Sequence, residues 1–133
     1  MKAVVNTDQA PIPKAPLSQA IVVDNLIFTS GQIPTTVSGD LLRGTIDEQT
    51  HQVMKNLQAI LSGAGATFAD VVKTSIYITD LTLYGKVNEV YGSYMKEPYP
   101  ARETVCVKDL VLGARVEISM IAVKPQGTPA PAA

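Results

Sequence analysis

Short apolar stretches with polar interruptions open the chain and predict β-strands. Residues 20–23 and 26–29 are rich in β-branched and apolar side chains, and Asp24-Asn25 supplies a two-residue turn between them. A further short strand is expected at residues 3–5. Together these segments predict a hairpin near the start of the fold.

Two later segments have the periodicity of amphipathic helices. Residues 46–64 place apolar side chains at the spacing of one helix face, and Thr45 with Glu48 has the form of a capping box before them. The second helix is expected after Asp80 or Thr82, either of which can cap it. Its apolar stripe consists of Leu83, Val87, Val90, Tyr91 and Tyr94.

Three longer strands are expected at residues 71–79, 102–107 and 115–123. In the first of these strands, the alternation of side chains places on one face Val72, Thr74, Ile76 and Ile78. The resulting order is strand–strand–helix–strand–helix–strand–strand. It predicts an α/β protein of the α+β type, with one mixed sheet and two helices packed on one face of that sheet.

The other face of this sheet has a mixed character. The alternation places on it Lys73, Ser75, Tyr77, Arg102, Thr104, Cys106, Glu117, Ser119, Ile121 and Val123. Glu103 is expected on the opposite face from Glu117. The mixed face is too polar for the core of a monomer and too apolar for a surface in water. We therefore expect subunits to pack on it, with polar pockets at their contacts.

Composition fits one domain. The chain has 133 residues, of which 46% are hydrophobic and 17% charged, and residues 1–124 are expected to form a single domain. Residues 125–133, rich in proline and alanine, are expected to be disordered. The sequence shows neither the apolar region of a signal peptide nor an apolar run of membrane-spanning length, which predicts a cytoplasmic protein.

Charge and residue counts narrow the chemistry. Eleven basic and twelve acidic side chains give a net charge of −1, and no run of Lys or Arg occurs, so nucleic acid is not favoured as a partner. A single cysteine, Cys106, and a single histidine, His51, exclude an internal disulfide and disfavour a transition-metal site. We interpret Cys106 as a small packed apolar residue and His51 as a solvated surface residue.

Arg102 is the strongest candidate for binding chemistry. Its guanidinium is always charged and its planar fork matches a carboxylate, while Thr104 and Cys106 beside it on the strand are small and neutral. Two interpretations are open. Either Arg102 closes the strand end through a salt bridge, for example to Glu103 or Glu97 across a subunit contact, or it binds a negatively charged ligand.

Four motifs occur in order: TSGQIP at residues 29–34, VVKTSIYITDL at 71–81, VNEVY at 87–91 and YPARETV at 99–105. With them the chain resembles the RidA/YjgF family, also labelled L-PSP endoribonuclease or translation inhibitor, from about Ala15 to Val123. The resemblance implies a fold like that of chorismate mutase. It also implies a homotrimer, in which three sheets form a barrel and three sites lie in clefts between subunits.

The resemblance implies an activity as well: hydrolysis of 2-imino acids such as 2-iminobutanoate and 2-iminopropanoate, the second derived from 2-aminoacrylate. The products are 2-keto acids and ammonia, and no cofactor is used. Arg102 would bind the substrate carboxylate. Ser30, Gly31 and Asn88 match the family's substrate site, although a solvent-facing amide remains open as the role of Asn88.

Three positions depart from the family's pattern. Leu17 stands where the family commonly has a tyrosine, and Thr104 where it has a cysteine whose backbone carbonyl faces the imine nitrogen. Ser119 replaces a water-orienting glutamate, and serine is no general base near neutral pH. Glu117 lies one strand repeat from Ser119. Two roles are open for it: it takes the place of the missing glutamate by acting through a water, or it forms an ion pair between subunits.

These departures keep a second hypothesis open, a non-catalytic trimer that binds a carboxylate metabolite and acts through a partner. The third hypothesis, an endoribonuclease, is disfavoured by the charge balance and the single histidine.

Overall fold

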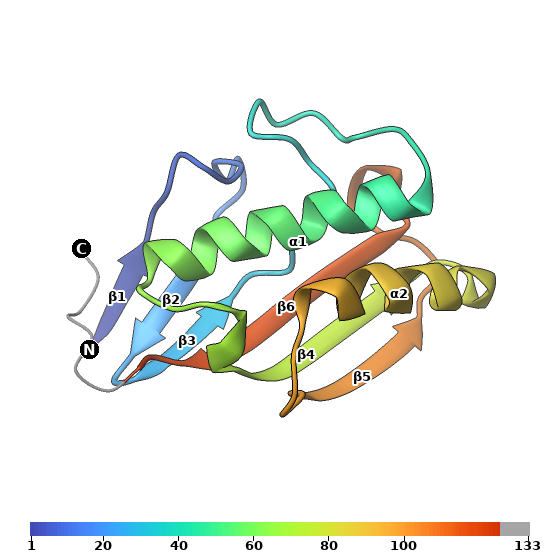
Figure 1. The fold of residues 1–133 in the computed structure, drawn as a ribbon. Helices are drawn as coiled ribbons and strands as arrows, with labels where there is room; N and C mark the ends of the chain where they lie inside the picture. Colours follow the sequence, from blue (N-terminus) through green and yellow to red (C-terminus); the bar gives the residue numbers. More distant parts are fainter. Residues whose placement is uncertain (126–133) are drawn as a thin grey trace.

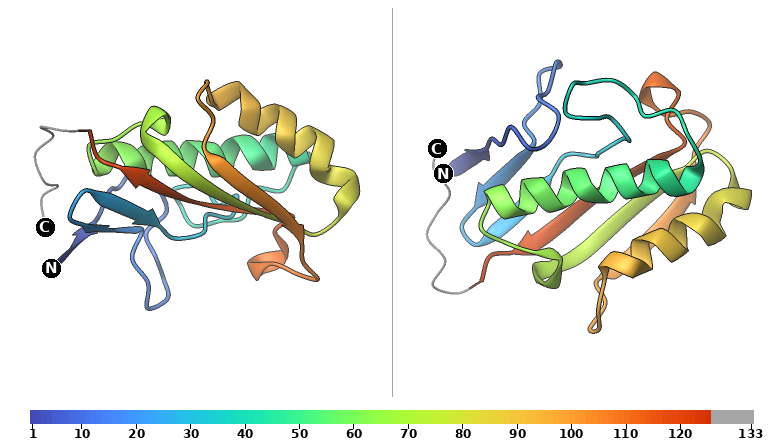
Figure 2. Two further views of the ribbon diagram at one scale, coloured as in Figure 1. Left: turned by 90° about the horizontal axis from the view of Figure 1, so that it is seen from below. Right: turned by 45° about the horizontal axis from the view of Figure 1, so that its top comes forward.

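The structure is a computed structural model in which residues 1–125 are described. Six strands form one sheet in the order β1-β2-β3-β6-β4-β5. Helices α1 (Ile46–Gly63) and α2 (Tyr84–Tyr94) both lie on the same face of it, as Figures 1 and 2 show. The strands are β1 (Lys2–Val5), β2 (Ala20–Val23), β3 (Leu26–Thr29), β4 (Val71–Ile78), β5 (Ala101–Cys106) and β6 (Val116–Val123).

This arrangement confirms the predicted fold class. All neighbouring strands pair antiparallel except β4 and β5, which are parallel and are joined by the crossover through α2. The hairpin between β2 and β3 has the predicted ends, and Asp24 takes a left-handed conformation in its turn (φ 53°). Disorder was expected for residues 125–133, and residues 126–133 of this tail lie outside the described residues.

Caps fix where the helices begin. The Thr45 hydroxyl accepts a hydrogen bond from the Glu48 backbone N–H at 3.1 Å, and the Glu48 carboxylate accepts one from the Thr45 N–H at 2.9 Å. The predicted capping box is therefore confirmed. Asp80 caps a short 3₁₀ turn, Leu81–Leu83, which leads directly into α2. The second helix thus starts one turn later than its capping residue.

The hydrophobic core lies between the two helices and the sheet. The central strand β6 contributes every second residue to it, as expected, and these side chains are at most 2% exposed: Val116, Ile118, Met120 and Ala122. From α1 the fully buried apolar side chains are Val53, Met54, Leu57, Ile60 and Leu61. Within residues 1–125 the core therefore uses one face of the sheet, and no helix of this range covers the other face, which we call the open face (Figure 2).

A β-bulge shifts the start of β4 and overturns one expectation. The pairing of β4 with β6 changes register between Val71 and Lys73. Val71 is buried (6% exposed) whereas Val72, which simple alternation assigns to the face of Thr74, is 45% exposed. The extra residue in the bulge breaks the two-residue period, so the prediction for Val72 was wrong.

The face assignment of β5 was also wrong. In the parallel pairing of β4 and β5, Arg102 lies beside Thr74 and Thr104 beside Ile76, and both partners are buried under the helices. Arg102, Thr104 and Cys106 therefore lie on the helix-covered face rather than on the open face. Because β5 is an edge strand with solvent access on both faces, its sequence carries no strong apolar bias from which its orientation could be derived.

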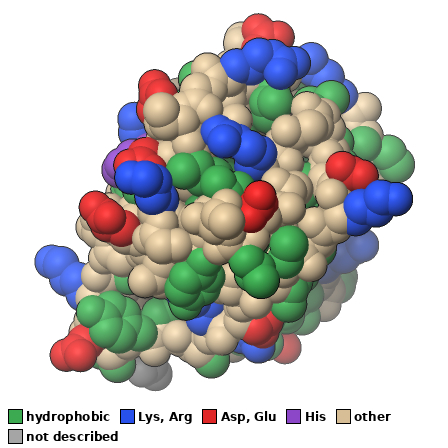
Figure 3. Space-filling view, turned by 90° about the vertical axis from the view of Figure 1, so that its right-hand side faces the viewer, with side chains coloured by type: hydrophobic (Ala, Val, Ile, Leu, Met, Phe, Trp, Pro, Cys, Tyr) green, Lys and Arg blue, Asp and Glu red, His purple; other side chains and the backbone are tan. Residues whose placement is uncertain are grey.

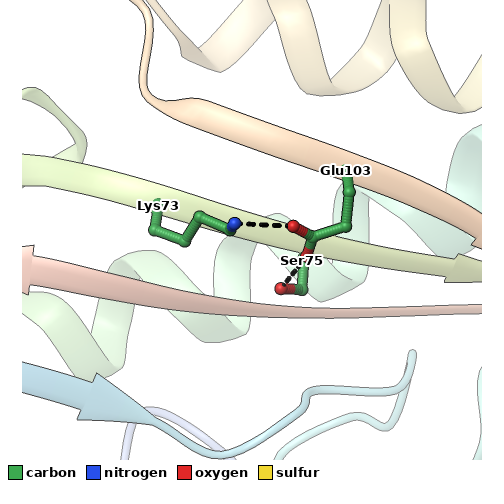
Figure 4. Close-up of polar contacts among 3 residues, drawn as sticks. All are labelled: Lys73, Ser75 and Glu103. Carbon is green, nitrogen blue, oxygen red and sulfur yellow. Dashed lines mark hydrogen bonds and ion pairs between the residues drawn. The ribbon is translucent and has the colours of Figure 1, made fainter.

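Glu103 correspondingly lies on the open face, the same face as Glu117, contrary to expectation. Its carboxylate pairs with the Lys73 ammonium at 2.7 Å and accepts a hydrogen bond from the Ser75 hydroxyl (Figure 4). This network links β4 to β5 at the polar end of the open face. Towards β3 the same face becomes apolar, with Phe28 and Ile121 directly opposite one another.

Replacing Glu103 by glutamine tests the network. The hydrogen bond from Lys73, with that from Ser75, holds the pKa of Glu103 below its ordinary value of 4.5. A carboxylate with a lowered pKa stabilises the fold above its unfolded pKa and loses that contribution as pH falls. Glu103→Gln should therefore lower the urea midpoint at pH 7 but not at about pH 3. Glu89→Gln, at an exposed position on α2, is the control, and equal losses at both pH values would contradict the ion-pair role.

Candidate functional site

Two separate cavities collect most of the predicted site residues. The larger, of about 530 Å³, is lined by Leu17, Ser30, Gly31 and Glu117 among others, and we call it the loop cavity. The smaller, of about 330 Å³, lies between α2 and β5, is lined by Asn88 and Arg102, and is called the arginine cavity below. The predicted residues are therefore brought together in two groups rather than one.

Arg102 is held in the arginine cavity by helix α2. Its Nη1 donates a hydrogen bond to Asn88 Oδ1 at 2.8 Å, and its Nη2 donates one to the Tyr84 hydroxyl at 2.9 Å. The guanidinium carbon also lies 5.2 Å from the centre of the Tyr91 ring, a cation–π distance. Asn88 thus contacts Arg102 directly, and its side chain is also exposed to solvent.

These partners leave the positive charge of Arg102 uncompensated. Asn88, Tyr84 and Tyr91 are neutral, and burial raises the pKa of the Tyr91 hydroxyl, against the opposing effects of its hydrogen bond to Thr74 and of the Arg102 charge. Within residues 1–125 no carboxylate lies at ion-pair distance from Arg102, and Glu103 is paired with Lys73 on the other face. The guanidinium has five N–H donors, so several remain for a ligand.

The sequence analysis did not identify Tyr84, and it assigned Tyr91 only to the apolar stripe. A signal was present: Tyr84, Asn88 and Tyr91 are spaced i, i+4 and i+7, which places them on one face of α2. That face meets the start of β5, where Arg102 lies.

Glu117 is the titratable group of the loop cavity. It is partly buried on the open face of β6, and desolvation by burial raises the pKa of its carboxyl above the ordinary value of 4.5. The carboxylate lies directly against Gly31: a Cβ at residue 31 would collide with Glu117 Oε2. Glycine at this position therefore makes room for the carboxylate.

Hydrogen bonds fix the loop that carries Leu17. The side chain of Gln19 is 1% exposed; its oxygen accepts from the Thr7 N–H at 2.8 Å and its amide donates to the carbonyls of Thr7 and Pro11. Ser30 donates its hydroxyl to the Ser18 carbonyl and its N–H to the Gln19 carbonyl. Gln19, which sequence reasoning missed, thus ties the N-terminal loop to the end of β3.

Two predicted residues line neither cavity. Ser119 lies on the open face opposite Ser75, two residues from Glu117 on β6. Thr104 follows Arg102 on the helix-covered face, and its hydroxyl oxygen is buried without a hydrogen-bond partner among the described residues. Cys106, interpreted as a packed residue, is exposed instead.

Neither metal ligation nor a membrane span is indicated in the described part of the chain. Residues 1–125 contain no group of three or more His, Cys, Asp or Glu side chains placed to hold a metal ion. Neither helix in this range combines the length and apolar character needed to cross a membrane.

Comparisons with known proteins agree on one family. The sequence profile of the family described as Endoribonuclease L-PSP matches residues 7–124. A RutC family protein of Pyrococcus abyssi is 46% identical over 124 residues, covering 92% of this chain and 98% of its own. Human 2-iminobutanoate/2-iminopropanoate deaminase is 39% identical over 125 residues, covering 93% of this chain and 91% of its own. The chain belongs to the RidA/YjgF family.

A solved member of this family has the same fold. The crystal structure of E. coli TdcF with bound serine has a TM-score of 0.87 and 32% sequence identity, covering 92% of this chain and 99% of TdcF. The RidA/YjgF fold thus extends over nearly the whole chain.

Gly31→Ala tests the contact between Gly31 and Glu117. The added methyl should displace the Glu117 carboxylate and lower the free energy of unfolding by about 1–3 kcal/mol, the usual cost of overpacking. The loss should largely disappear when Glu117→Ala is present as well, which a double-mutant cycle in urea measures. Gly85→Ala is the control, because a Cβ there meets nothing within 4 Å. An equal loss in both backgrounds would show that another contact is responsible.

The raised pKa of Glu117 predicts a pH dependence of opposite sign to that of Glu103. A carboxyl whose folded pKa is raised destabilises the fold as pH rises above its unfolded pKa, near 4.5, because the charged form is poorly solvated. Glu117→Gln, which stays neutral, should therefore raise the melting temperature more at about pH 8 than at about pH 4. Thermal unfolding at both pH values measures this, and a larger gain at the lower pH would contradict it.

Proposed function

We propose that this protein hydrolyses reactive 2-imino and enamine acids, of the 2-iminobutanoate and 2-aminoacrylate class, to 2-keto acids and ammonia. The observation that carries the proposal is the uncompensated charge of Arg102 in a cavity, held by neutral partners. A planar guanidinium with free N–H groups is suited to a carboxylate, and each charge-assisted hydrogen bond contributes about 1.5–3 kcal/mol. A relative is named 2-iminobutanoate/2-iminopropanoate deaminase, which supports a substrate that carries an imine beside its carboxylate.

The active molecule is proposed to be a homotrimer. Arg102 lies on the helix-covered face, whereas Glu117 belongs to the loop cavity on the open face, so one protomer does not bring the two together. A site at a subunit contact, with one protomer supplying Arg102 and Asn88 and its neighbour supplying Ser30, Gly31 and Glu117, resolves this separation. The partly apolar open face and the unpaired edge of β5 are the surfaces for such packing.

Hydrolysis adds water across the C=N bond and then breaks the C–N bond. In the proposed reaction Glu117 takes a proton from the attacking water, because a carboxyl with a raised pKa is a stronger base than an ordinary one. The proton is passed to nitrogen, which gives a carbinolamine. The hydroxyl proton of this intermediate then moves to nitrogen as the C=O bond forms, the C–N bond breaks and ammonia leaves, while Arg102 fixes the carboxylate beside the reacting carbon. Ser119, roughly 6–7 Å along the strand from Glu117, would orient the water by a hydrogen bond. Thr104 would present its backbone carbonyl to the imine nitrogen.

A direct assay tests the activity. Threonine dehydratase releases an enamine that becomes 2-iminobutanoate, and lactate dehydrogenase with NADH reports the 2-ketobutyrate formed from it. The purified protein should accelerate 2-ketobutyrate release. Arg102→Ala should lower kcat/KM at least about tenfold, since it removes the charge-assisted pair. No acceleration by the intact oligomer would refute the proposal.

Mixing two impaired variants tests where the site lies. Arg102→Ala and Glu117→Gln should each retain at most about a tenth of the wild-type activity alone. After joint unfolding and refolding, random assortment should restore about a quarter of the wild-type sites, because one protomer then supplies the arginine and the other the glutamate. No recovery, with mixed trimers demonstrated by mass spectrometry, would contradict a site shared between subunits.

The non-catalytic alternative is favoured by one observation: the described protomer places Ser119 in neither cavity. In that case calorimetry would show 2-ketobutyrate binding that requires Arg102, without turnover in the assay above. The endoribonuclease alternative finds less support, since the side of the molecule in Figure 3 shows acidic and basic side chains interspersed with hydrophobic ones rather than a continuous basic patch.

A further inference from the structure

The loop cavity has an apolar wall that the proposed chemistry does not use. Four large hydrophobic side chains line it and are nevertheless solvent-exposed: Ile12 (60%), Leu17 (53%), Val111 (67%) and Leu112 (61%). They come from two loops far apart in sequence, one before β2 and one between β5 and β6. Exposed apolar side chains that gather at one cavity mark a binding surface more strongly than the same residues scattered singly.

The size of the cavity does not match the smallest proposed substrates. In the single protomer the cavity measures about 530 Å³, within the range of pockets that enclose drug-sized ligands, and the Arg102 of a neighbour would fill part of it. The methyl group of 2-iminopropanoate or the ethyl group of 2-iminobutanoate would occupy a small part of such a space. The remaining lining is largely hydrocarbon, so it suits a larger apolar substituent.

Leu112 adds an independent observation. Its backbone is left-handed (φ 60°, ψ 14°), and the next residue, Gly113, is left-handed too (φ 76°). For a residue with a branched side chain this conformation costs about 1–2 kcal/mol. Burial does not offset the cost, because the side chain is 61% exposed. Strain kept at a cavity wall points to a function of that side chain rather than to folding.

We propose that this apolar wall binds the hydrocarbon side chain of the substrate, so that the protein prefers 2-imino acids with longer or branched apolar side chains over those with methyl or ethyl groups. The inference rests on the proposed function and names the substrate class of the same site. The wall is continuous with Ser30, Gly31 and Glu117, which line the same cavity. Each additional buried CH₂ should raise kcat/KM about fourfold.

A substrate series tests the preference. An L-amino-acid oxidase generates the imino acids of 2-aminobutyrate, norvaline and leucine in situ, and competition with semicarbazide reports their hydrolysis. We expect kcat/KM to rise along this series, with leucine about tenfold or more above 2-aminobutyrate. A flat or falling series, with activity on the 2-aminobutyrate product intact, would overturn this inference but leave the proposed function standing. Absence of activity on every member would instead count against the proposed function.

A variant of Leu112 tests the wall itself. Leu112→Asn removes the hydrocarbon but keeps a residue that accepts the left-handed conformation. The ratio of kcat/KM for the leucine-derived over the 2-aminobutyrate-derived imine should fall at least about fivefold, without a lower melting temperature. Leu81→Asn is the matched control, since Leu81 is 66% exposed and lines neither cavity.

Two results would overturn the role of Leu112. One is an unchanged ratio in Leu112→Asn. The other is an equal loss for both substrates accompanied by a changed oligomeric state, which would assign the side chain to a subunit contact.

Discussion

Alternation of side chains across a β-sheet separates the two charged groups on which the proposed chemistry depends. Arg102 follows the helix-covered side of β5, and Glu117 follows the open side of β6. No rotamer change carries either group through a sheet whose helix-covered face is packed with Val116, Ile118 and their neighbours. A reaction that used Arg102 as the carboxylate anchor and Glu117 as the base would therefore need two copies of the chain, and the argument for the proposed oligomer rests on the strand period rather than on surface hydrophobicity alone.

The neutral partners of Arg102 explain how a charge is kept available at such a site. An acidic partner would hold the guanidinium equally well, but it would also compete with the carboxylate of any ligand. Asn88 and Tyr84 fix its direction through hydrogen bonds of 2.8 and 2.9 Å, and Tyr91 supports it from the ring face. All three residues lie on one face of α2. Because the helix is rigid, they hold the Arg102 side chain on the edge strand in a fixed position. On the other side of the sheet, the acid–base pair of Lys73 and Glu103 satisfies its charges internally.

Where one face of a strand is buried, the sequence predicted the structure well. In β6 the alternation of Val116, Ile118, Met120 and Ala122 is strict, and every one of these residues is buried. The edge strand β5 does not alternate between buried and exposed residues in this way. Its face assignment was therefore wrong, and so were the faces expected for Arg102, Thr104 and Glu103. Val72 was assigned to the wrong face because the strict two-residue alternation of a strand does not reveal a β-bulge. The loop cavity could not be derived at all, since it depends on the three-dimensional meeting of loops near residues 12 and 112.

Glu117, rather than Ser119, has the features of a base on the open face of β6. Ser119 and Glu117 share a face of β6, and only Glu117 combines partial burial, a raised pKa and contact with a cavity. Gly31 leaves the space that its carboxylate occupies, and any side chain there would push it away. In the proposed reaction the attacked carbon lies beside Glu117, in the cavity that Leu17 and Leu112 also line. The position of Glu117 and the apolar lining of the cavity are therefore consistent with the inferred preference for a substrate whose side chain is longer than two carbons.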